Sequence, residues 1–494
     1  MITQRFGRGV KIVFIEYIIV AITGLLFFAL LGRIISFEEI GIFSIITFTI
    51  TILATLIEFS AGTIASQLIG SARGEKNTDQ VPGIVRSSLR MVLSFALIAF
   101  SIALCFVIFW QIMIFDFLFT LIVILVPVIG GIRMLYFGFL LGLEKFGIKS
   151  VLAVTVFVLP KVLGLGLVIF LNTGLWGLVV SLLIGELLTL SLCVIFGGVP
   201  VLSDTNVPIR QIFGLGVALS VILLLVRLFD YVDRLVIFFR AGDLFALGAY
   251  DLSIRLLAPL FSLTIVITSV SLPILSYTIK EDSESKHEYI STLLRFYLVI
   301  FAPFFMFLAV TINGQLPQLI YGATYPLLGT IFSVLVIASL FQGLLLLGIS
   351  LLQAIGERTS FILLGVPVII LDVIFTWLLL PVLGGYGIAI MRLVSYVFAS
   401  LLLLYILWKK AQPSLELKWT LKLVGLLLIV VLPILIMNLL SWSLWILFLV
   451  EAFLAFSLFV LSIRFLRIIE EKDRTRLAAT FPFLAPFIRL FRGD

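Results

Sequence analysis

Long apolar runs, separated by short polar or glycine- and proline-containing stretches, recur along the whole 494-residue chain. A membrane-spanning helix needs about 20 mostly apolar residues, and fourteen runs meet that requirement. They lie at residues 10–34, 41–69, 89–111, 117–141, 150–171, 174–197, 211–239, 244–278, 293–313, 327–352, 360–381, 386–408, 421–440 and 443–465. The pattern predicts an all-α integral membrane protein with 14 transmembrane helices and no soluble domain.

Composition supports the same fold class. Hydrophobic residues make up 62% of the chain and charged residues 12%, whereas soluble domains are about 45–50% apolar and about 25% charged. Soluble enzymes and nucleic-acid-binding proteins are therefore excluded. The net charge of +7 is typical of a membrane protein with basic cytoplasmic loops.

The positions of the basic residues predict the topology. With the N-terminus inside, most of the 33 Lys and Arg residues lie at the cytoplasmic ends of the runs, and only Arg33 and Arg240 lie at the opposite ends. This asymmetry predicts a multi-pass protein of the cytoplasmic membrane with both termini in the cytoplasm. The tail after Arg464 mixes Phe and Ile with Arg and Lys, which fits either an interfacial helix at the inner leaflet or a disordered basic tail.

Three landmarks recur at a nearly constant offset. Residues 40–43 (IGIF) resemble residues 247–250 (LGAY), which lie 207 positions later. Gly138 and Ser150 recur 210 positions later as Gly348 and Ser360. Residues 174–177 (GLWG) resemble residues 384–387 (GGYG), again 210 positions later. Six spans separate the copies, so the two halves have the same orientation, as in parallel transporter repeats. We therefore expect an N-lobe at 1–200, a C-lobe at 201–410, two further spans at 411–465 and a basic tail at 466–494.

Apart from those within two residues of a run end, fourteen charged residues lie inside the runs. The basic ones are Arg133, Lys161, Arg227, Arg234, Arg255 and Arg392, and the acidic ones are Glu16, Glu58, Glu186, Asp230, Asp233, Asp251, Asp372 and Glu451. Each costs about 3 kcal/mol if it faces lipid at mid-depth. We expect most of them to face a hydrated cavity, to pair with one another, or to extend toward the interface, as predicted for Glu16 near a span end.

The seventh run carries a polar stripe. Arg227, Asp230, Asp233 and Arg234 fall on one side of a helix, and Asp251 and Arg255 are spaced i,i+4 in the next run. Such groups either neutralise one another between packed helices or line a polar interior.

Three interior cations have no opposite charge one turn away: Arg133, Lys161, which follows Pro160, and Arg392. They are candidates for an anion site. The alternative is pairing across helices with Glu58, Glu186 or Asp372.

Residues for catalysis or metal binding are scarce. Cys105 and Cys193 lie in separate apolar runs without a CxxC partner, and the single histidine, His287, lies in a charged loop. We therefore expect no catalytic residues, no metal site and no cofactor.

Several segments resemble the polysaccharide transporter family, which includes oligosaccharide and O-antigen flippases, within the multidrug/oligosaccharidyl-lipid/polysaccharide flippase superfamily. They are residues 31–43 (LGRIISFEEIGIF), 230–250 (DYVDRLVIFFRAGDLFALGAY), 320–325 (IYGATY), 352–356 (LQAIG) and 384–387 (GGYG). The resemblance extends over nearly the whole chain, but its motifs are short.

The resemblance implies two parallel six-helix lobes around a central cavity, plus two additional C-terminal helices. In this family the cavity binds the diphosphate and sugars of a polyisoprenoid-linked oligosaccharide and exposes them alternately to each side of the membrane. Cations expected to bind the substrate are Arg133, Lys161, Arg227, Arg255 and Arg392. Acids that could bind a coupling ion are Asp230, Asp233, Asp372 and Glu58.

The resulting hypothesis is a flippase, not an enzyme. Its expected partners are the lipid-linked oligosaccharide, membrane lipids and glycan polymerases or glycosyltransferases, with no nucleic acid. Two alternatives stay open: an ion-coupled multidrug or cation antiporter of the same superfamily, and a membrane polysaccharide polymerase or ligase.

Overall fold

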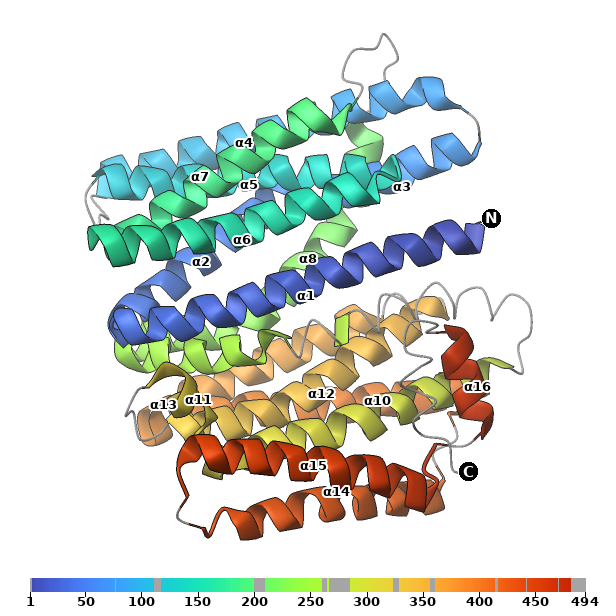
Figure 1. Ribbon diagram of the computed structural model, residues 1–494. Helices are drawn as coiled ribbons and strands as arrows, with labels where there is room; N and C mark the ends of the chain where they lie inside the picture. Colours follow the sequence, from blue (N-terminus) through green and yellow to red (C-terminus); the bar gives the residue numbers. More distant parts are fainter. Residues whose placement is uncertain are drawn as a thin grey trace. The chain divides into compact units, whose positions relative to one another are not determined.

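The computed structural model describes residues 2–75, 77–110, 117–199, 209–259, 264–265, 285–322, 328–355, 360–413, 416–440, 442–469 and 471–480. Helices account for nearly all of these residues, and no strand occurs among them (Figure 1). Within them, 11 helices are long and apolar enough to cross a membrane. The chain divides into two compact units, Met1–Leu235 and Val236–Asp494.

The first unit is a bundle of long helices. Its elements are α1 (Ile2–Ile34), α2 (Phe37–Glu58), α3 (Ala61–Gly74), a 3₁₀ turn η1 (Thr78–Gln80), α4 (Val81–Trp110), α5 (Phe117–Gly142), α6 (Phe146–Leu171), α7 (Leu175–Gly197) and α8 (Ile209–Val236). Helix α5 packs against α2, α3, α4 and α7, and α6 packs against α1 and α7. Helix α5 is therefore central to the core of this unit.

The second unit begins with a π-helical turn, η2 (Ile237–Ala241), and a helix at 244–259. It continues with α10 (Ser285–Val310), a 3₁₀ turn η3 (Thr311–Gly314), α11 (Leu316–Tyr321), α12 (Leu328–Ala354), α13 (Ser360–Ala411), α14 (Leu417–Met437), α15 (Leu444–Leu466) and α16 (Glu471–Thr480). Helix α12 packs against α10 and α13, whereas α14 packs against α10 and α15.

The second predicted span, 41–69, is wrong as one helix, because the chain breaks between α2 and α3. Phe59 and Ser60 at the break have left-handed backbone, with φ of 48° and 55°. The carboxylate of Glu58 stabilises the break, since it accepts hydrogen bonds from the amides of Ser60 at 2.9 Å and Gly62 at 2.6 Å. The ring of Phe59 stacks on Phe213 of α8, so the break also positions α8.

Two of the repeated landmarks share local structure. Ser36 caps α2 by accepting from the Glu39 amide at 3.2 Å, and Asp243, 207 residues later, caps the helix at 244–259 by accepting from the Ala246 amide at 2.9 Å.

Gly174, at the start of α7, and Gly384, inside α13, both adopt a backbone conformation reserved for glycine, with φ/ψ of 54°/−136° and 55°/−146°. Gly384 interrupts α13 between the eleventh and twelfth predicted spans, so one helix label covers both runs.

Candidate functional site

Arg133 of α5 lies against α7 in the first unit. It is 8% exposed, and its guanidinium binds Glu186 at two points, with Nε–Oε2 at 2.5 Å and Nη2–Oε1 at 3.1 Å. The guanidinium also lies 5.0 Å from the centre of the Phe137 ring. Of the two alternatives for Arg133, the structure shows the pairing across helices. An anion that binds Arg133 must therefore share it with Glu186 or displace that carboxylate.

Lys161 of α6 extends toward α1. Its Nζ lies 3.3 Å from the position that a Cβ atom would occupy at Gly24, and the side chain is half-buried. The preceding Pro160 packs against Gly185 of α7, where a Cβ atom would stand only 2.3 Å from the proline Cγ. The proline thus fixes α6 on α7 while the next residue directs its ammonium group to the opposite side, toward α1.

Glu16 of α1 does not extend to the interface as predicted. It is 6% exposed, and its carboxylate binds Lys149 Nζ at 2.8 Å and accepts from Ser150 Oγ at 2.6 Å. The prediction for Glu16 is wrong because the start of α6 supplies both a cation and a hydroxyl donor. Ser150, one of the repeated landmarks, therefore links α6 to α1.

The polar stripe of α8 is only partly described. Asp233 and Arg234 are both buried; the Asp233 carboxylate accepts from the Arg234 amide at 2.8 Å, and the Arg234 guanidinium lies 4.5 Å from the Tyr231 ring centre. Arg227 is half-buried. The side chain of Asp230 lies outside the described residues.

Glu58 is 4% exposed and holds the α2–α3 break through both carboxylate oxygens. Its geometry is that of a backbone cap. Ion coupling through Glu58 stays a prediction, and an incoming ion has to bind an oxygen that already accepts an amide proton.

In the second unit Arg255 pairs with Asp251 one turn earlier, as the i,i+4 spacing predicts. Asp251 is fully buried, while the Arg255 side chain is 21% exposed. Beside them the Tyr321 hydroxyl donates to the Leu252 carbonyl at 2.9 Å, which ties α11 to the helix at 244–259. Burial raises the pKa of Tyr321, so its hydroxyl stays protonated as a donor.

Arg392 and Asp372 lie in the two halves of α13. Arg392 is 7% exposed, with its guanidinium 5.3 Å from the Tyr396 ring centre. Asp372 is 5% exposed and accepts from Ser395 Oγ at 2.8 Å. Since Ser395 lies three residues after Arg392, the polar groups of both halves of α13 occupy one buried region.

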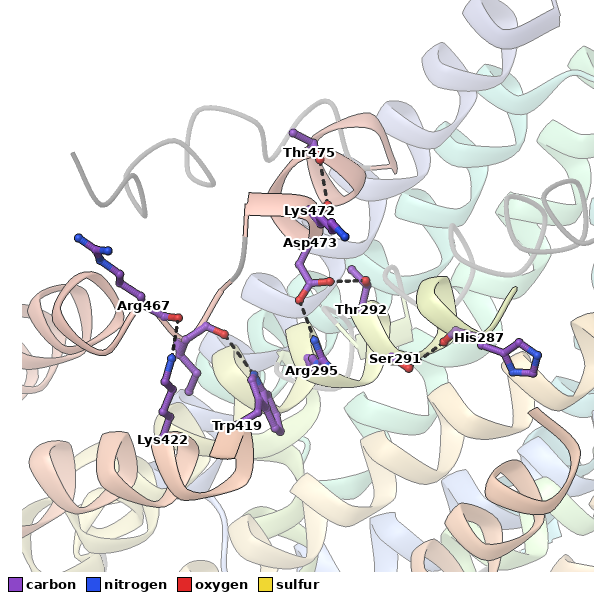
Figure 2. Close-up of polar contacts among 11 residues, drawn as sticks. His287, Ser291, Thr292, Arg295, Trp419, Lys422, Arg467, Lys472, Asp473 and Thr475 are labelled. Carbon is purple, nitrogen blue, oxygen red and sulfur yellow. Dashed lines mark hydrogen bonds and ion pairs between the residues drawn. The ribbon is translucent and has the colours of Figure 1, made fainter. Parts of the chain in front are cut away.

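Two carboxylates with structural roles were not among the candidate site residues. Glu451 of α15 is fully buried and accepts from Thr311 Oγ1 at 2.6 Å and the Ile312 amide at 2.9 Å. Asp473 of α16 binds Thr292 and Arg295 of α10 (Figure 2). Glu451 could be found as a charge inside an apolar run, whereas no local pattern distinguishes Asp473 from the other charges of the tail.

The described residues contain no group of three or more His, Cys, Asp or Glu side chains able to hold a metal ion. The interior cations instead lie within separate helix packings: Arg133 and Lys161 in the first unit, Arg255 and Arg392 in the second. How the cations of the two units combine in one site stays a prediction.

A family model described as polysaccharide biosynthesis protein matches residues 6–279. No curated protein matches the chain. Among solved structures, the lipid II flippase MurJ in an inward closed conformation aligns with a TM-score of 0.74 at 16% identity, covering 91% of this chain and 97% of that one.

An inward-facing multidrug resistance MATE family transporter of the MOP superfamily aligns with a TM-score of 0.60 at 15% identity, covering 82% of this chain and 96% of that one. A MOP superfamily transporter from Pyrococcus furiosus, described as having a binding pocket of reverse polarity, aligns at 0.55 and 15% identity, covering 82% and 96%. At these identities the likeness shows the fold.

Proposed function

We propose a function from one premise, which is that the chain belongs to the polysaccharide biosynthesis protein family. It is a multi-pass membrane protein with the fold of MOP superfamily transporters. We infer that it is a flippase that moves a polyisoprenoid-(pyro)phosphate-linked oligosaccharide across the cytoplasmic membrane by alternating access, for cell-surface polysaccharide or glycan synthesis.

The observation that carries this proposal is the combination of family and fold. The family is one of polysaccharide synthesis, while the fold matches a flippase of lipid II along 91% of the chain. A family member that assembled sugars would need catalytic groups, whereas a transporter needs a passage and groups that bind its cargo. We therefore favour a protein that carries a lipid-linked sugar over one that joins sugars.

In the proposed architecture, fourteen spans form two parallel six-helix lobes and an additional C-terminal pair, with both termini in the cytoplasm. The shared caps at Ser36 and Asp243, and the matched backbones at Gly174 and Gly384, support the parallel repeat. Glycosyltransferases or a polymerase act before and after such a step, so they are its proposed partners.

Phosphate groups are the proposed anchor of the cargo. Arginine binds phosphate oxygens at two points and stays charged at any physiological pH. Arg392 in the second unit and Lys161 in the first are the strongest candidates, with Arg227 as a further contact. Arg255 and Arg133 contribute if Asp251 and Glu186 share or release them. Asp233 and Asp372, both buried, are the favoured acids for a coupling ion, followed by Asp230 and Glu58.

The test is the triple variant Arg255→Gln, Lys161→Gln and Arg392→Gln. In cells, this variant should accumulate the lipid-linked glycan on the inner leaflet when export is compared at equal amounts of protein in the membrane. The comparison at equal amounts is needed because Arg255→Gln also removes an ion-pair partner of the fully buried Asp251. The charge-matched control is Arg90→Gln, Lys409→Gln and Lys418→Gln, three exposed positions, and it should export normally. Normal export by the first variant contradicts the proposed phosphate anchor.

A multidrug or cation antiporter is the second candidate, and the MATE-like fold together with buried Asp233 and Asp372 favours it. It predicts a cationic substrate held by acids. Binding of a cationic dye that is lost in Asp372→Asn, without binding of a lipid-linked sugar, would replace the flippase proposal. A polymerase or ligase is ranked below both, and formation of glycan bonds by the purified protein would establish it.

A further inference from the structure

Among the described side chains of helix α16, one buried carboxylate, that of Asp473, binds α10 (Figure 2). Asp473 is 6% exposed; its Oδ1 accepts from Thr292 Oγ1 at 2.5 Å, and its Oδ2 lies 3.4 Å from Arg295 Nη1. Among the side chains described for α16, those of residues 471–475, only Asp473 is buried. These described contacts therefore hold the helix by charge rather than by an apolar face.

The groups that receive Asp473 form an anion receptor. Thr292 and Arg295 are three residues apart, so they lie on one face of α10. The guanidinium of Arg295 lies 5.9 Å from the Trp419 ring centre, and Trp419 Nε1 donates to the Ile468 carbonyl at 3.1 Å. A hydroxyl donor and a guanidinium held beside an anchored indole provide donors for a phosphate as readily as for a carboxylate.

A further cation is held on the Trp419 side of the receptor. Lys422 donates to the Arg467 carbonyl at 3.3 Å, which places an ammonium group near the side of the receptor marked by Trp419 (Figure 2). This is the basic end of α10, the end that the charge distribution predicts to be cytoplasmic. Phosphate groups of lipids are concentrated at that depth of a membrane.

Loss of Asp473 alone is unfavourable. The Arg295 side chain is 11% exposed, and removing the Asp473 carboxylate takes an ion-pair partner away from this largely buried cation. Undocking of α16 is therefore favoured when another anion takes the place of the carboxylate.

We propose that Thr292 and Arg295 form a phosphate-binding site that Asp473 fills as an internal ligand, so that phosphate and docked α16 compete. The ligand is a phosphate group, supplied either by an anionic lipid headgroup or by free phosphate. The site is separate from the proposed cargo cations, and the proposal holds whatever molecule is transported.

The first test uses Asp473→Asn in the full-length protein, in nanodiscs of phosphatidylcholine. Because the variant lacks the competing carboxylate, inorganic phosphate should raise its unfolding midpoint by about 3 °C more than it raises that of the wild type, against chloride of equal ionic strength. Adding Arg295→Gln should abolish this gain, whereas adding Lys418→Gln, an exposed lysine of α14, should preserve it. If Arg295→Gln fails to fold, Thr292→Val should reduce the gain at least by half.

The second test follows amide exchange in residues 472–480 of the wild type. Nanodiscs containing phosphatidylglycerol should increase exchange several-fold relative to phosphatidylcholine alone. A rise with inorganic phosphate as well assigns the site to phosphate itself, and a rise with the lipid only assigns it to the headgroup. The proposal is overturned if amide exchange in residues 472–480 rises with neither phosphate nor phosphatidylglycerol. It is also overturned if both anions stabilise the Asp473→Asn variant no more than they stabilise the variant that carries Asp473→Asn together with Arg295→Gln.

Discussion

Arg133 of α5 and Glu186 of α7, 53 positions apart in the chain, form a two-point ion pair with distances of 2.5 and 3.1 Å. Their side chains are 9% and 14% exposed. The pair links two helices of the first unit and neutralises two charges that the membrane interior disfavours. The pair also limits how Arg133 can bind a substrate, because its Nε and Nη2 groups already donate hydrogen bonds to Glu186.

Breaking this pair should destabilise the protein more than removing it. Glu186→Gln leaves a buried guanidinium with a weaker partner, so we expect a loss of about 3 kcal/mol in unfolding free energy. The double variant Arg133→Met and Glu186→Leu should recover most of that loss. Thermal unfolding in detergent measures both, and additive losses in the double variant would contradict the proposed pairing.

Transport by the same double variant distinguishes a structural role of Arg133 from a role in substrate binding. If Arg133 acts only on Glu186, the recovered protein exports its glycan normally. If Arg133 takes part in substrate binding, export falls although the unfolding midpoint returns toward the wild-type value.

Replacing either of the two repeated glycines, Gly174 or Gly384, should lower the free energy of unfolding. Gly174→Ala and Gly384→Ala each place a side chain at a positive φ with a strongly negative ψ, which costs about 1–3 kcal/mol. Gly166→Ala in the interior of α6, where a Cβ atom meets nothing within 4 Å, should be neutral or stabilising by about 0.5–1 kcal/mol. Unfolding midpoints of the three variants test this order, and equal midpoints would refute the conformational argument.

Removing the helix N-caps at Ser36 and Asp243 should also lower the stability of the protein. Ser36→Ala and Asp243→Ala each remove an acceptor from a helix N-terminus, and each should cost about 1 kcal/mol. The sites lie in different units, so the two losses should add. Denaturant unfolding of the single and double variants provides the check, and strong coupling between them would be unexpected.

Much of the fold could be predicted from the pattern of apolar runs, because crossing a bilayer demands length and apolarity that a single sequence shows directly. The α2–α3 break could not, since Phe59 and Ser60 carry no glycine or proline signal and their left-handed backbone depends on the Glu58 carboxylate. The glycines at 174 and 384 were visible as landmarks, and their backbone conformation gives the physical reason.

The sequence predicts which charged residues lie in the membrane interior, but not the ion-pair and hydrogen-bond partners of most of them. The spacing of Asp251 and Arg255 predicted their pair because both lie on one helix. Arg133 had no such local signal, since its partner is on another helix. The prediction for Glu16 is wrong for the same reason, because its partners Lys149 and Ser150 belong to another helix, α6.

Movement of a lipid-linked, phosphate-bearing sugar across the bilayer is the central property proposed for this protein, and reconstituted vesicles measure it directly. Purified protein is placed in liposomes with a polyisoprenoid-diphosphate oligosaccharide on one leaflet, and a membrane-impermeant glycosidase reports the fraction that reaches the other leaflet. We expect the wild type to raise this fraction over minutes, and the Arg255, Lys161 and Arg392 triple glutamine variant to match protein-free vesicles. Equal transfer with and without the wild-type protein would contradict the account.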